Sequence, residues 1–254
     1  GGFKQLLHLL GGVVGGHVPF WFGPLHLVHR VAGDEVQLHR LFQRLVEIGV
    51  EPQHTGGFQR FPLVEIKALD VSRLQAAQRD LQLELNATPL TNPKRRTELM
   101  QAFFGAAGEG LYLECPVYAN WGCNTYWGER CYANFNLTLV DDGEIFIGSH
   151  TMIGPNVTLV ATGHPVRPDL RYQGAQYSLP VHIGENVWIG ANVTVLPGVT
   201  IGDNAVIGAN SLVTKDIPAN TVAYGSPCKV IREINERDDV YYWRCLLYTS
   251  DAAD

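Results

Sequence analysis

The chain has 254 residues, of which 46% are hydrophobic and 17% are charged, and this composition is typical of a globular protein that buries a substantial core. Its 19 Lys and Arg residues against 25 Asp and Glu residues give a net charge of −6, which argues against nucleic acid as a partner. Five Cys residues in a chain too large to need disulfide staples favour reduced thiols and a cytoplasmic location.

The two ends of the chain fit no structural pattern. Residues 1–68 hold six of the nine His residues, and the first Met of the chain is Met100. We interpret this segment as an extension or an artefact of sequence assembly, and residues 244–254 resemble a translated sequencing adapter. The uncharged stretch between Lys4 and Arg30 is interrupted by Pro and His residues, so no membrane span is predicted.

Residues 69–112 predict a helical N-terminal cap. Ser72 and Gln75 have the spacing of a capping box, and apolar residues at helical spacing follow them. Asn92 before Pro93 predicts the start of a second helix that stops at Gly105. The apolar residues of the two helices are Leu74, Ala77, Leu81 and Leu85, then Leu99, Met100, Phe103 and Phe104.

Six consecutive hexads between Ile183 and Pro218 carry an aliphatic residue at every sixth position. Neither a helix nor an ordinary strand has this period, and hexapeptide repeats mark a parallel β-helix. We therefore predict an all-β solenoid, a left-handed parallel β-helix over residues 113–228, in which residues eighteen apart stack. The Gly at the second position of four hexads, with Asn204 and Asn210, is expected to form the corners. The inward positions are 183, 189, 195, 201, 207 and 213.

The repeat is interrupted at two places. Earlier hexads begin at 127, 133, 139, 147, 153 and 159, so two residues are inserted near 141–144, and Trp121 and Cys115 are expected to continue the phase. Residues 165–180 lack the repeat and predict an extruded loop, which in a solenoid is usually functional. Residues 229–243 form a C-terminal segment, and a short helix is expected after Pro227.

Polar residues gather at these interruptions. His164 lies at the mouth of the extruded loop, where a half-exposed imidazole suits a general base. Asn134, Asp141 and Asp142 lie around the insertion, where carboxylates can accept hydrogen bonds from sugar hydroxyls, although a solvated turn has the same composition. The spacing of eight between Cys115, Cys123 and Cys131 is not that of a metal knuckle, so no metal site is predicted.

Several motifs together resemble the maltose and galactoside O-acetyltransferase family of hexapeptide-repeat acyltransferases. They are YANFNLTLVDD, TGHPV, the hexads from Ile183 and GSPCKVIREI, and the resemblance covers about residues 74–240. It implies a left-handed β-helix, a homotrimer with active sites between subunits, and acetyl-CoA as a co-substrate with no permanently bound cofactor. The acidic residue that reaches the sugar from the N-terminal segment of that family has no counterpart before Leu74.

The resemblance also implies roles for individual residues. His164 matches the general base that takes a proton from the acceptor hydroxyl. Residues matching the acceptor pocket are Asn134, Asp142, Tyr132 and Asn120, where Asn120 replaces a frequent Ser. Residues matching the CoA side are Trp188, Ala191, Ala209, Thr214, Lys229 and Arg232, where Ala191 replaces a small hydroxyl residue and Lys229 replaces an Arg.

Two other functions remain open at this point. A non-catalytic trimeric β-helix that serves as a binding module has the same repeat, because fold alone does not imply function. A zinc carbonic anhydrase-like enzyme needs three converging His ligands. His164 and His182 are eighteen apart and are expected to stack, but His150 is a poor third ligand.

Overall fold

A computed structural model describes residues 68–240 of the chain. The predicted extension, apart from its last residue, and the predicted adapter-like tail lie outside these residues. No helix within the described range is both long and apolar enough to cross a membrane.

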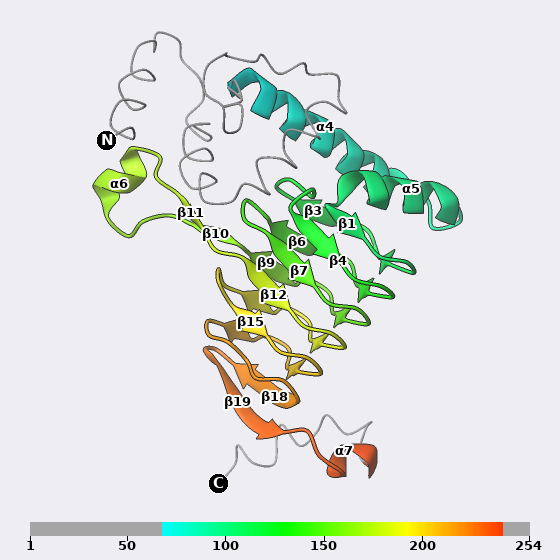
Figure 1. Cartoon of the computed structure of the whole chain (residues 1–254), viewed down its shortest axis with the longest axis vertical. Coiled ribbons are helices and arrows are strands. Elements are labelled where there is room, and N and C mark those ends of the chain that lie inside the picture. The colour runs from blue at the N-terminus through cyan, green and yellow to red at the C-terminus, as the bar shows by residue number, and fades with distance from the viewer. Residues whose placement is uncertain (1–67, 241–254) are drawn as a thin grey trace, which may run out of the picture.

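Two helices lie across the N-terminal end of a solenoid (Figure 1). The first, α4, spans Ala68–Ala87, and the second, α5, spans Pro93–Phe103. Asn92 caps α5 as predicted, because its side-chain oxygen accepts a hydrogen bond from the Arg95 amide at 3.3 Å. The capping box predicted at Ser72 is wrong, because α4 begins before Ser72. Residues 68–71 contain no Pro or Gly that would prevent the helix from starting there.

The helices cover the open edge of the first coil. Gln82 accepts a hydrogen bond from the Ala119 amide at 2.7 Å, and Asn86 bonds both the amide and the carbonyl of Val117 at 2.9 Å. The buried guanidinium of Arg96 donates to the Leu113 carbonyl at 2.6 Å. An edge strand otherwise exposes unpaired main-chain groups, so these side chains act as a polar cap.

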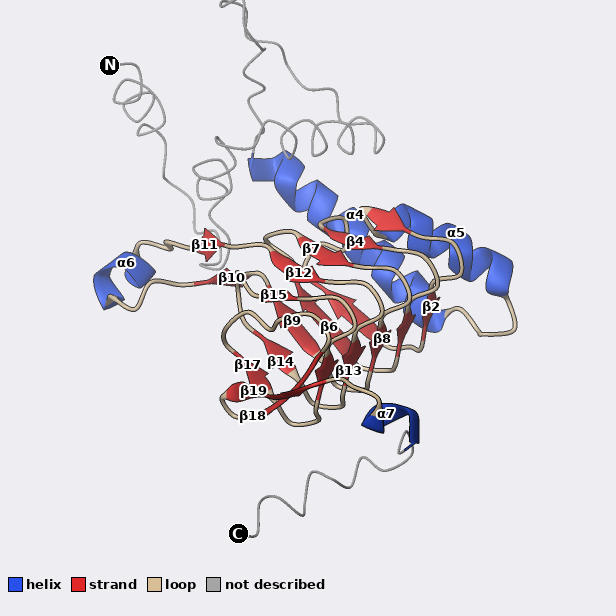
Figure 2. Cartoon of the chain, turned by 60° about the horizontal axis from the view of Figure 1, so that its bottom comes forward, coloured by secondary structure: helices blue, strands red, loops and turns tan. Residues whose placement is uncertain are grey.

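The solenoid is the left-handed β-helix expected, with three faces of stacked strands (Figure 2) that run parallel within the coils. Face I contains β1 (Ala106–Ala107), β4 (Thr125–Trp127), β7 (Ile145–Ile147), β12 (Val181–Ile183) and β15 (Thr200–Ile201). Face II contains β2 (Tyr112–Leu113), β5 (Tyr132–Ala133), β8 (Met152–Ile153), β13 (Trp188–Ile189), β16 (Val206–Ile207), β18 (Thr221–Gly225) and β19 (Cys228–Glu233). Face III contains β3 (Val117–Ala119), β6 (Leu137–Val140), β9 (Thr158–Val160), β14 (Thr194–Val195) and β17 (Leu212–Val213).

The remaining elements depart from the coils. The loop between β9 and β12 protrudes from the solenoid (Figure 1) and contains β10 (Thr162–Gly163), α6 (Pro168–Tyr172) and β11 (Tyr177–Ser178). A short helix was expected after Pro227, but the segment that directly follows forms strand β19, which pairs antiparallel with β18. Only then does the short helix α7 (Arg237–Val240) follow. The first coil strand starts at Ala106, which is earlier than the predicted residue 113.

The register confirms the stacking by eighteen residues in most of the hexads and corrects it at both ends, since Ile207 lies opposite Ala223, sixteen residues on, and the upstream coils stack by twenty. Ile183 lies opposite Ile201, eighteen residues on, whereas Trp127 lies opposite Ile147 and Leu139 opposite Leu159, each twenty residues on. The first coil has its own insertion at residues 120–124, which stacks on the one at 141–144. For this reason Ala119 and Leu113, and not Trp121 and Cys115, hold the inward positions.

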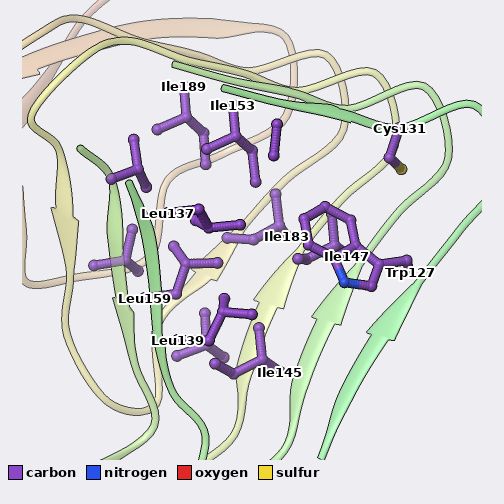
Figure 3. Packing of buried hydrophobic residues seen from close by; sticks show 14 of the residues in the cluster. Trp127, Cys131, Leu137, Leu139, Ile145, Ile147, Ile153, Leu159, Ile183 and Ile189 are labelled. Carbon is purple, nitrogen blue, oxygen red and sulfur yellow. The ribbon is translucent and has the colours of Figure 1, made fainter. Parts of the chain in front are cut away.

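The core is a column of aliphatic side chains inside the prism (Figure 3). All six predicted inward positions, Ile183, Ile189, Val195, Ile201, Ile207 and Val213, are buried with at most 3% of their surface exposed. Each inward residue packs on the residues one coil above and below it. Burial of this column is the main apolar stabilisation of the solenoid.

The roles of Gly and Asn at the corners differ from those predicted. The left-handed backbone belongs to the fourth residue of five of the six hexads, with φ of 58° at Asn204 and 59° at Asn210, and Gly198 takes the same place at 81°. The second-position Gly instead allows close stacking. A Cβ on Gly190 would lie 2.7 Å from the Ala209 amide nitrogen of the next coil.

A pair of substitutions at Asn204 separates backbone conformation from side-chain bonding. Asn204 accepts a hydrogen bond from Asn186 at 2.8 Å and donates one to Asn220 at 2.9 Å. Both variants lose this amide ladder. Asn204→Ala also keeps a Cβ in the left-handed region without the Asn side chain that tolerates this conformation, which costs about 1 kcal/mol, whereas Gly adopts the conformation freely. We expect Asn204→Ala to lower the free energy of unfolding in urea by about 1–2 kcal/mol and Asn204→Gly by less. Equal losses in the two variants would show that the ladder alone matters.

Candidate functional site

His164 lies directly after β10, on the extruded loop, and its ring is exposed. Its Nδ1 atom is 3.0 Å from the carbonyl oxygen of Ala175 on the returning arm of the loop. A proton on Nδ1 donates to this carbonyl and leaves Nε2 unprotonated, which is the tautomer of a proton acceptor. The loop therefore sets both the position and the tautomer of this imidazole.

The extruded loop is held by its own polar contacts. Strands β10 and β11 pair antiparallel, and the Arg171 guanidinium donates to the Pro165 carbonyl at 3.0 Å and to the Val166 carbonyl. Apolar side chains nevertheless remain exposed along the loop; they are Val166, Leu170, Tyr172, Tyr177 and Leu179. A protruding segment with this many exposed apolar residues is typical of a contact surface.

Asp142 and Asn120 lie at the same corner as His164, where face III turns into face I. The Asn120 side-chain amide donates to Asp142 Oδ2 at 2.6 Å, and the Trp121 indole N–H donates to Asp142 Oδ1 at 3.2 Å. The base of the loop packs on this corner, because a Cβ on Gly143 would lie 2.7 Å from the Ala161 carbonyl oxygen. His164 and Asp142 thus share what we call the III–I corner.

Asp141 is a buried carboxylate at the III–I corner whose burial the sequence did not reveal. Its side chain has no exposed surface, and it accepts hydrogen bonds from the Trp121 amide at 2.8 Å and the Thr125 hydroxyl at 3.1 Å. Burial raises the pKa of Asp141 from 3.8 to about 6, and these two hydrogen bonds oppose the rise only in part. The charge of Asp142 adds to the rise.

Asn134 and Tyr132 lie elsewhere. Asn134 is at the II–III corner, between β5 and β6, and its side-chain oxygen accepts a hydrogen bond from the Phe135 amide at 2.8 Å. Tyr132 is on face II, where its ring stacks on Tyr112 with a centroid distance of 6.0 Å. Desolvation raises the pKa of its phenol, and the charges of Glu114 and Tyr112 raise it to a smaller extent. The II–III corner is separated from the corner of His164 by one six-residue side of the prism, whose length is at most about 20 Å.

The residues predicted for the CoA side are also divided. Trp188 is half-exposed on β13 of face II, in register with Met152 and Val206. Ala191 and Ala209 lie at the II–III corner, and Lys229 is exposed on β19. Thr214 follows β17 and belongs to the III–I corner.

Arg232, the other basic residue of β19, already has an anionic partner. Its guanidinium forms a bidentate pair with the Asp238 carboxylate at 2.6 and 2.8 Å, and this hydrogen bonding lowers the pKa of Asp238. The pair holds the end of β19 to α7.

One chain therefore does not bring the predicted site residues together. The III–I corner holds His164, Asp142, Asn120 and Thr214. The II–III corner and face II hold Asn134, Tyr132, Trp188, Ala191, Ala209, Lys229 and Arg232. A surface hollow in the described part of the chain lies at neither place, since it is bounded by α5 and β1 and lined by residues such as Thr97, Gln101 and Glu109.

The His residues considered for zinc do not converge. Over residues 68–240, no group of three His, Cys, Asp or Glu side chains lies close enough to hold a metal ion. His182 stacks its ring on Phe146 with a centroid distance of 4.9 Å, on face I. His150 is exposed at a corner with a φ of 62°.

Comparisons with known proteins agree with the repeat and extend beyond it. A family profile for bacterial transferase hexapeptide (six repeats) matches residues 180–215. The galactoside O-acetyltransferase of Lactococcus lactis subsp. lactis (strain IL1403) is 56% identical over 156 residues, which cover 61% of this chain and 75% of that protein. A solved galactoside acetyltransferase in complex with coenzyme A is 48% identical, with a TM-score of 0.67, over 71% of this chain and 90% of its own. A maltose O-acetyltransferase from Clostridium difficile 630 is 40% identical, with a TM-score of 0.65, over 67% and 90%.

Asp141 predicts a pH-dependent stability difference. Because its folded-state pKa lies above its unfolded one, its contribution to stability is greatest below about pH 4 and is lost as the pH rises through 6. Asp141→Asn keeps an acceptor for the Trp121 amide and gains a donor for Thr125, but carries no charge. We expect this variant to be more stable than the parent at pH 7.5 by roughly 2–3 kcal/mol, and the advantage to shrink towards pH 4.5.

Urea unfolding of both proteins at pH 4.5, 6 and 7.5, at one protein concentration, measures this difference. An advantage of Asp141→Asn that is the same at every pH would contradict the assigned titration, as would a loss of stability at pH 7.5.

Proposed function

This chain belongs to the maltose and galactoside O-acetyltransferase family of hexapeptide-repeat acyltransferases, and on that premise we propose that it transfers an acetyl group from acetyl-CoA to a hydroxyl of a sugar or a similar small acceptor. The observation that carries the proposal is the exposed His164 at the III–I corner, with Nδ1 held at a carbonyl and Asp142 one coil away.

His164 acts as the general base. Its Nε2 takes the proton of the acceptor hydroxyl while the hydroxyl oxygen attacks the thioester carbonyl carbon. The tetrahedral intermediate then collapses, the carbon–sulfur bond breaks, and the imidazolium returns its proton to the CoA thiolate. Main-chain N–H groups at the coil corners are the donors available to the oxyanion, and the chemistry requires neither a metal nor a covalent enzyme intermediate.

The acceptor side suits an uncharged polyol. Asp142 offers carboxylate oxygens, while Asn120 and Asn134 offer amides, and all three can bond hydroxyl groups. The same negative corner disfavours an acceptor that carries a carboxylate of its own.

The donor side must meet a polyanion with a protein of net charge −6. Lys229 and Lys215 are exposed and supply local positive charge near the end of face II and the III–I corner. Arg232 binds a phosphate only in competition with Asp238, because that carboxylate occupies its guanidinium. The half-exposed ring of Trp188 gives the donor an apolar surface on face II.

The division of the site residues between two corners supports a homotrimer with sites between subunits. The III–I corner of one chain supplies the base, and the II–III corner of a neighbour supplies Asn134 and much of the donor surface. The exposed apolar residues of the extruded loop, such as Val166 and Tyr172, then pack on the neighbouring chain.

Substitution of His164 tests the base. With acetyl-CoA and a panel of sugars, we expect His164→Ala to lower kcat for release of the CoA thiol by about 10²–10⁴-fold. His182→Ala is the matched control, because His182 is an exposed imidazole on face I outside the proposed site. Acetyl transfer that survives His164→Ala at the parent rate would exclude His164 as the base.

Mixing two inactive variants tests the shared site. His164→Ala removes a residue of the III–I corner, and Asn134→Ala removes one of the II–III corner. A mixed trimer therefore contains some interfaces at which one chain supplies an intact His164 and its neighbour an intact Asn134. After unfolding and refolding an equal mixture, we expect about a quarter of the parent activity, as random assembly of a cyclic trimer predicts. Refolding each variant alone is the control. A mixture as inactive as its components would place the whole site within one chain.

A further inference from the structure

At the III–I corner, the carboxylates of Asp141 and Asp142 accept hydrogen bonds from two successive residues of the preceding coil. Asp141 accepts from the main-chain amide of Trp121 at 2.8 Å, and Asp142 accepts from the indole N–H of the same residue at 3.2 Å. Asn120 completes the set with its bond to Asp142 at 2.6 Å. Trp121 is thus held at its main chain by one carboxylate and holds the other with its ring.

This network lies where the repeat gives least support. The hexads from Ile183 stack by eighteen residues on the next coil up to Val213, whereas both coils that carry Trp121 and Asp142 contain inserted residues and stack by twenty. Asn124, in the first insertion, donates to the Asp141 carbonyl at 2.8 Å, and the buried Thr125 donates to the Asp141 side chain. The two insertions are therefore joined to each other by polar bonds.

We propose that Trp121 is a positioning residue for the acceptor: its indole N–H, anchored through Asp141, fixes the direction of the Asp142 carboxylate. This inference rests on the proposed function, because it assigns Asp142 to acceptor binding. Each Asp142 oxygen receives one donor from the protein and keeps a further lone pair for a substrate hydroxyl. A carboxylate held at both oxygens presents those lone pairs in one direction and distinguishes between acceptors by the placement of their hydroxyls.

The chain offers a close control for the indole N–H. Trp127 is also buried in the early coils, but its Nε1 atom has no hydrogen-bond partner. Trp121→Phe removes a bonded N–H, and Trp127→Phe removes an unbonded one at a similar loss of ring size. A difference between these variants reports the hydrogen bond and not the ring.

Steady-state kinetics on the full chain test the proposal. We expect Trp121→Phe to raise KM for the acceptor roughly 5–10-fold, with kcat and KM for acetyl-CoA unchanged and with a fall in Tm similar to that of Trp127→Phe, because both variants shorten a buried ring. Trp127→Phe should leave KM for the acceptor unchanged. In an Asp142→Ala background, Trp121→Phe should have no further effect on kcat/KM for the acceptor, because the residue acts only through Asp142.

Each other outcome is decisive. An unchanged acceptor KM in Trp121→Phe, an equal rise in Trp127→Phe, or an effect that persists in the Asp142→Ala background overturns the positioning role while the proposed function stands. A parent protein that releases no CoA thiol with any acceptor overturns both. If Trp121→Phe does not fold, Thr125→Val removes one anchor of Asp141 instead, and a smaller rise in acceptor KM at unchanged kcat is expected, whereas no rise overturns the proposal.

Discussion

The register of the parallel main-chain ladder is the constraint on which the rest of this structure depends. Each strand of two or three residues is too short to be stable alone, and it persists because the strands above and below pair with it. The inward aliphatic column, with Ile183 opposite Ile201, keeps that register, because a slip of one residue would turn the column to solvent. The same register is also supported by the left-handed backbone at Asn204 and its equivalents and by the tight stacking at Gly190.

The base and part of the acceptor side that we propose lie where this register is relaxed. Inserted residues in the early coils bring Asn120, Trp121 and Asp142 to one corner, and the extruded loop brings His164 to the same corner. The regular coils turn within a few residues at each corner, with a left-handed Asn or Gly at the turn, so the longer corner segments occur only in the irregular coils of the described range. The regular hexads provide instead the flat face II, on which Trp188 lies.

Charge is arranged locally in a molecule whose net charge is −6. Asp141 is buried at a cost in stability at neutral pH, although an uncharged Asn would satisfy the same two partners. Such a cost is commonly found at functional sites, where stability and activity conflict. At the other end of the solenoid, the pairing of Arg232 with Asp238 shows that an anion already occupies the guanidinium expected to bind phosphate.

The sequence by itself determined the coils, because a period of six admits one architecture and the inward positions follow from it. It also located the loop and the cap of α5 at Asn92, whose signals are local. Tertiary structure decided the rest. The phase at Ala119 depends on two insertions that stack on each other. The strand β19 depends on the edge of β18, and the burial of Asp141 depends on the coil that covers it. The division of His164 and Asn134 between two corners likewise follows from the closed triangular path of the chain, which a linear pattern does not contain.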